Sequence, residues 1–141
     1  MRRLALVLCL VGGAAVAHQG VKNPAVQARM HNMGLISGAM KELGNMAKGS
    51  VAFDADAANA ALGVLRDEAG KTVALFEAHE DDPKSEARAE IWANFSDFTA
   101  KAGALEAAAV SVGAVASLED VRSALGTLGQ TCKACHKPYR E

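Results

Sequence analysis

Four segments of this chain repeat apolar residues every three or four positions, which is the spacing of one face of an α-helix. They run from about residue 26 to 46, 62 to 76, 95 to 112 and 118 to 139. Only six of the 141 residues are aromatic, and Ala, Gly and Met are abundant where a sheet protein would carry β-branched residues. The sequence therefore predicts an all-α fold, an antiparallel four-helix bundle.

Local signals set the expected ends of these helices. Asp54 and Asn94 can each accept hydrogen bonds from the free amides that begin a helix, and Ser117 with Asp120 forms a capping-box pattern. Gly49-Ser50, Asp81-Asp82-Pro83 and the stretch around Gly113 interrupt the periodicity, and residues 81 to about 92 are polar. We expect a connection there between the second and third helices.

The first seventeen residues have the composition of a secretory signal peptide. Arg2 and Arg3 precede an apolar run from Leu4 to Val11, and small residues end in Ala15-Val16-Ala17. We expect export to the periplasm with cleavage near Ala17, which leaves one domain over residues 18–141. No later segment approaches the roughly 20 apolar residues that a membrane span needs.

Cleavage would change both the charge and the cysteine content of the chain. It would leave 13 basic against 16 acidic residues, so nucleic acid is not an expected partner. Cys9 would be lost, and Cys132 and Cys135 would remain as the two cysteines of the mature chain. Many inward positions of the bundle are Ala or Gly, so a large apolar cofactor would fill space that the side chains leave.

Cys132 and Cys135 precede His136 in the pattern C-x-x-C-H, which attaches haem of the c type. Residues three apart lie on one face of a helix, so both thiols can reach the same porphyrin edge. The adjacent imidazole can then bind the iron. We therefore predict one covalent haem c near the C-terminus.

Three other interpretations of the cysteines are weaker. A zinc site needs two further ligands, and His18, His31 and His79 are isolated along the chain. A thiol-disulfide oxidoreductase carries its cysteine pair at the start of a helix that follows a strand, and no strand is evident here. A structural disulfide is compatible with export but leaves the adjoining histidine unexplained.

The whole mature chain resembles the class II cytochromes c, the cytochrome c prime family. Haem attachment at the extreme C-terminus of four helices and the pair Arg29-x-x-x-Met33 carry the resemblance. Three further stretches support it: Ile91-Trp92-Ala93-Asn94, Ser117-Leu118-Glu119-Asp120-Val121-Arg122 and Gly129-Gln130-Thr131-Cys132-Lys133-Ala134-Cys135-His136-Lys137-Pro138-Tyr139-Arg140.

This resemblance implies a role for each site residue. Cys132 and Cys135 would form the thioether links, His136 would be the proximal iron ligand, Met33 would lie on the distal face, and Arg29 would lie near a haem propionate. In low-spin members the distal methionine binds iron and the protein carries electrons. In high-spin members that site lacks a protein ligand, and nitric oxide or carbon monoxide binds.

The run from Met33 to Gly49 looks closer to the low-spin members, so we expect an electron carrier without substrate turnover, and therefore no enzyme. Its partners would be redox proteins that the sequence does not identify, and a homodimer remains open. Met33 is one of several methionines on the first helix, where methionine also fills irregular core space, and Met30 is a weaker ligand candidate. Lys133, Lys137 and Arg140 could guide an acidic partner or simply complement a helix end.

Overall fold

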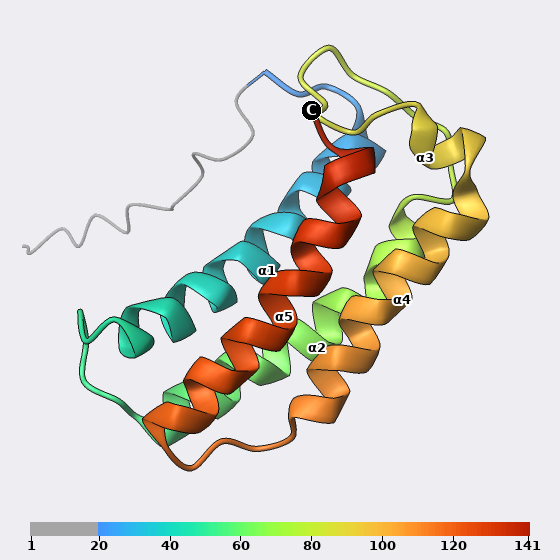
Figure 1. Ribbon diagram of the computed structural model, residues 1–141. Coiled ribbons are helices and arrows are strands. Elements are labelled where there is room, and N and C mark those ends of the chain that lie inside the picture. The colour runs from blue at the N-terminus through green and yellow to red at the C-terminus, as the bar shows by residue number, and fades with distance from the viewer. Residues whose placement is uncertain (1–19) are drawn as a thin grey trace, which may run out of the picture.

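The computed structural model describes residues 20–141 as an all-helical fold, so the predicted signal peptide lies outside the described residues. Its helices are α1 (Pro24–Ala47), α2 (Ala55–Leu75), α3 (Glu90–Ala93), α4 (Phe95–Val112) and α5 (Leu118–Tyr139). The four long helices form a ring in which α1 contacts α2, α2 contacts α4, α4 contacts α5 and α5 contacts α1. Figure 1 shows consecutive long helices running in opposite directions, which confirms the predicted antiparallel four-helix bundle.

Short polar motifs begin most of the long helices. The Asn23 side chain accepts hydrogen bonds from the first amides of α1, with Pro24 in the first turn. Asp54 caps α2, and Ser117 with Asp120 forms the predicted capping box of α5. The prediction that the Asn94 side chain caps α4 is wrong, because that side chain makes no capping hydrogen bond.

Two helix ends differ from the simplest expectation. Helix α2 ends at Leu75, before the predicted stop at residues 81–83, and the Leu75 carbonyl accepts a hydrogen bond from a side chain of α1 that is described below. Gly113 ends α4 with a positive φ of 66°, a conformation that costs glycine little because it lacks Cβ. The connection between α2 and α4 is mostly irregular and includes the short helix α3.

The core has two parts. A larger aliphatic cluster fills the space between the four long helices and includes the fully buried Leu43, Leu62, Leu65 and Leu128. A smaller aromatic cluster, built around Phe76, Phe98 and Tyr139, lies at the end of the bundle where α1 begins and α5 ends. Met33 packs against both clusters, so the boundary between them lies beside α1.

No helix within residues 20–141 has the length and apolar character needed to cross a membrane.

Candidate functional site

A cavity of about 580 Å³ opens at the boundary between the two core clusters, which is within the usual size range of ligand pockets. Helix α1 contributes one wall and the last turns of α5 contribute another, while the end of α2, the connection before α3, α3 itself and α4 contribute the rest. Apolar surface dominates its lining, as expected for a site that holds a large apolar group.

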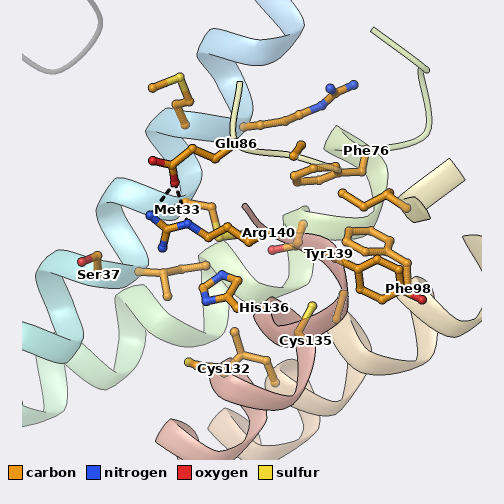
Figure 2. A pocket seen from close by; sticks show the side chains of 18 of the residues that line it. Met33, Ser37, Phe76, Glu86, Phe98, Cys132, Cys135, His136, Tyr139 and Arg140 are labelled. Atoms are coloured by element: carbon orange, nitrogen blue, oxygen red, sulfur yellow. Dashed lines mark hydrogen bonds and ion pairs between the residues drawn. The ribbon is translucent and has the colours of Figure 1, made fainter. Parts of the chain in front are cut away.

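The three residues of the C-x-x-C-H pattern line this cavity together. Cys132 and Cys135 lie about one helical turn apart on α5, and both are partly buried. Figure 2 shows the His136 imidazole beside them, directed into the same space. The helix thus brings two thiols and one imidazole to a single wall, as the spacing predicts.

The surroundings of the two thiols favour their protonated forms. Burial is the main cause of a raised pKa at both Cys132 and Cys135. A reactive cysteine needs the opposite, a lowered pKa, which helix N-termini and nearby cations provide. These two cysteines lie in the C-terminal part of α5, where the helix dipole disfavours a thiolate.

His136 has a neutral imidazole available as a ligand. Burial lowers the pKa of His136, and the nearby Arg140 guanidinium lowers it further. The Glu86 carboxylate acts in the opposite direction, but the net pKa is lowered. Neutral imidazole is the form that binds transition metals. Within residues 20–141, no group of three or more His, Cys, Asp or Glu side chains is arranged to hold a metal ion.

Methionine side chains of α1 form the facing wall. Met30, Met33 and Met40 are each partly buried and line the cavity. They belong to the predicted apolar stripe, whose deeply buried members are Val26, Ile36, Leu43 and Met46. Gly34 and Ser37 continue this wall, and added atoms at Gly34 would meet nothing within 4 Å.

Arg29 lines the same cavity, but its guanidinium nitrogens donate to backbone oxygens. Nε donates to Leu75 O at 2.9 Å, Nη1 to Glu80 O at 2.7 Å and Nη2 to Ala78 O. The guanidinium also lies over the rings of Phe76 and Trp92, at 4.9 and 5.1 Å. The predicted propionate contact stays a prediction, and the structure adds a role for Arg29 in fixing the chain that follows α2.

A segment that sequence reasoning missed closes one side of the cavity. Residues 84–87 line it, and they are held by the end of the chain. Ala87 and Arg140 form an isolated antiparallel bridge, and both Nε and Nη2 of Arg140 contact one oxygen of Glu86, at 2.6 and 2.5 Å. Figure 2 shows this pair beside Met33. A polar loop carries no local signal for such a position, because its partners lie more than fifty residues away.

The remaining histidines that the structure describes lie away from the cavity lining. His31 and His79 are both exposed, and the His79 ring stacks on the Trp92 ring with their centroids 4.3 Å apart.

A four-helix bundle with a C-x-x-C-H wall facing an apolar cavity defines a helical c-type cytochrome. Comparison with known proteins agrees, because the family model described as Cytochrome C' matches residues 24–140. The chain therefore belongs to the cytochrome c prime family.

Individual relatives carry two kinds of name. A cytochrome c-556 of Agrobacterium tumefaciens (strain B2A) is 37% identical over 117 residues, covering 82% of this chain and 95% of the relative. A cytochrome c' of Cereibacter sphaeroides is 30% identical over 146 residues, covering 99% and 98%. Among solved structures, a nitric oxide complex of a cytochrome c prime variant from Alcaligenes xylosoxidans aligns with a TM-score of 0.73 at 30% identity, covering 83% and 94%.

Proteins of this family bind covalently attached haem c, and so does this chain. The donor set fits the group, since two thiols and an imidazole face one apolar cavity from a single helix.

Proposed function

We propose that this protein is an exported, periplasmic one-electron carrier that turns over no substrate of its own. Membership of the cytochrome c prime family supports a haem protein. The lining of the cavity supports an arrangement in which α5 mainly holds the haem and α1 shields it. When bound, the haem iron supplies one-electron chemistry, and the protein sets its ligands and environment. The electron would be exchanged with partner redox proteins.

In this proposal Cys132 and Cys135 form the thioether links and His136 is the proximal ligand. The observation that carries it is that all three line one cavity from neighbouring turns of α5. The raised pKa values of Cys132 and Cys135 disfavour the thiolate forms that a dithiol oxidoreductase or a zinc site would use. The competing thiol-disulfide function is therefore not the one the site supports.

Met33 is the proposed sixth ligand. It lines the same cavity from α1, is partly buried, and packs against both core clusters, which limits its motion. A methionine sulfur opposite histidine stabilises ferrous iron and raises the reduction potential. Filling the sixth position in both oxidation states also keeps the structural change on electron transfer small.

The second candidate function is the binding of nitric oxide or carbon monoxide at a five-coordinate iron. The observation that favours it is the similarity to a cytochrome c prime that has been solved as a nitric oxide complex. Here Met33 would line the distal side without binding iron, as a flexible apolar side chain.

Covalent attachment is tested first, by acid-acetone extraction of the protein purified from a host that attaches haem c. The haem should stay with the chain, and replacing Cys132 and Cys135 by serine should let the extraction remove it. Release of the haem from the unaltered chain would refute the site assignment.

An optical spectrum of the ferrous protein then separates the two functions. A sharp low-spin spectrum that carbon monoxide leaves unchanged is expected for Met33 ligation. The variant Met33→Leu keeps nearly the same volume without a thioether, so it should turn high-spin and bind carbon monoxide. Met30→Leu, on the same wall, is the matched control and should keep the parent spectrum. A parent protein that is already high-spin and binds carbon monoxide would favour the gas-binding function instead.

A further inference from the structure

Three polar side chains connect the cavity wall to the surface of α4. The Tyr139 hydroxyl donates to Oδ2 of Asp97 at 2.5 Å, and Nζ of Lys101 donates to Oδ1 of the same carboxylate at 2.8 Å. Lys101 and Tyr139 both line the cavity, while Asp97 bridges them. The network therefore places one positive and one negative charge beside the site.

Tyr139 is fixed in this network from several sides. It is 5% exposed, and its ring packs edge-on against the Phe98 ring with the ring centroids 5.5 Å apart. Figure 2 labels both residues at the cavity. Its carbonyl accepts a hydrogen bond from the amide of Arg88, which ties the end of α5 to the loop before α3. The hydrogen bond to Asp97 and burial raise the pKa of Tyr139 to about 12, so the phenol stays protonated and donates.

Lys101 lines the same cavity as Cys135 and His136, so the charged pair lies beside the haem-attachment helix. The hydrogen bonds from Lys101 and Tyr139 lower the pKa of Asp97, so its carboxylate is charged at neutral pH.

We propose that Asp97 and Lys101 are a pair of charges that set the reduction potential of the haem in opposite directions, with Tyr139 holding Asp97 in place. Reduction by one electron removes one positive charge from the haem site. A nearby cation therefore favours the ferrous form, and a nearby anion favours the ferric form.

Exposure decides which charge has the larger effect. The Lys101 side chain is 32% exposed and the Asp97 side chain 53%, and only Lys101 reaches the cavity lining. Water screens the more exposed charge more strongly, so removing Lys101 should shift the potential further than removing Asp97. The inference rests on the electron-carrier function, but it holds whether or not Met33 binds the iron.

The test is spectroelectrochemical titration of purified holoprotein variants at low ionic strength. Lys101→Met should lower the midpoint potential, and Asp97→Asn should raise it by a smaller amount. Lys101→Arg keeps the charge and should leave the potential close to that of the parent. Arg122→Met removes a charge from α5 about 21 Å along the helix from His136, so it should shift the potential least.

Opposite signs separate an electrostatic effect from damage to the pocket, since added water access would move both variants in the same direction. Tyr139→Phe leaves both charges in place and should shift the potential less than Asp97→Asn.

Equal signs for Lys101→Met and Asp97→Asn, or shifts no larger than that of Arg122→Met, would overturn the proposal. If Asp97→Asn does not fold, the comparison of Lys101→Met with Lys101→Arg decides the sign alone. The optical spectra of the same variants report the sixth ligand separately, so failure of this proposal and failure of Met33 ligation are distinguishable.

Discussion

Replacing Arg29 by methionine should cost the folded protein about 2–4 kcal/mol. The guanidinium donates to three backbone oxygens, and a hydrogen bond from a charged group contributes about 1.5–3 kcal/mol. The full sum would be an upper bound, because residues 77–81 are exposed and water can replace part of what is lost. Methionine retains an apolar stem in place of that of arginine, so most of the packing survives.

The loss is large against the roughly 5–15 kcal/mol that a domain of this kind has in total. It arises in a particular place, because Arg29 is 3% exposed and lies over Phe76 and Trp92, which belong to the aromatic side of the cavity. Without the guanidinium, the backbone oxygens of Leu75, Ala78 and Glu80 lose their hydrogen-bond donor. We expect Arg29→Met to accelerate hydrogen exchange, relative to the parent, more in residues 76–82 than in α4.

Urea unfolding of the holoprotein, followed by far-ultraviolet circular dichroism and by haem absorbance, measures this cost. Arg29→Lys, which keeps the charge but offers a single nitrogen, should lose an intermediate amount. A loss below about 0.5 kcal/mol for Arg29→Met would refute the reasoning. A parallel measurement of the midpoint potential examines the propionate prediction, since removing a cation paired with a propionate would lower the potential.

Three further predictions follow from individual contacts. Leu128→Ala should lose about 2–5 kcal/mol in urea unfolding, because Leu128 is fully buried, whereas the exposed Leu35→Ala should lose less than about 1 kcal/mol. Ser117→Ala should lose about 1 kcal/mol from the α5 capping box and leave the haem spectrum unchanged, and an altered spectrum would contradict a purely local role. Hydrogen bonds from the backbone amides of residues 84, 22 and 23 lower the pKa of Asp82, so its stabilising effect is present above about pH 4 and is lost as pH falls through the lowered value. The stability difference between the parent and Asp82→Asn, from thermal unfolding across about pH 2–6, should therefore shrink on acidification, and a difference that grows would show that the sign is wrong.

Signals confined to a few neighbouring residues were enough to predict much of this protein. The helical periodicity, the capping box at Ser117 and the stop at Gly113 all operate within one or two turns of chain. The approach of Cys132 and Cys135 to one surface also follows from helix geometry alone. These features are correct because local backbone geometry dictates them whatever the rest of the molecule does.

Contacts between distant segments were beyond such reasoning. The partners of Arg29 lie 46 to 51 residues away, and the hydroxyl of Tyr139 meets Asp97 across 42 residues. The polar loop around Glu86 likewise lines the cavity, and its contact with Arg140 spans 54 residues. The Asn94 cap is a local exception, because the same residue also ends α3, where its amide donates to Glu90 O.

By itself, therefore, the sequence determined that four amphipathic helices form and that two thiols and an imidazole share one wall near the C-terminus, because spacing along a helix fixes which side chains share a face. Only the tertiary structure decided what faces that wall. Packing of α1 and α4 against α5 places Met33 in the same cavity and brings Asp97 and Lys101 beside it, and such packing depends on long-range shape and burial that no short motif encodes.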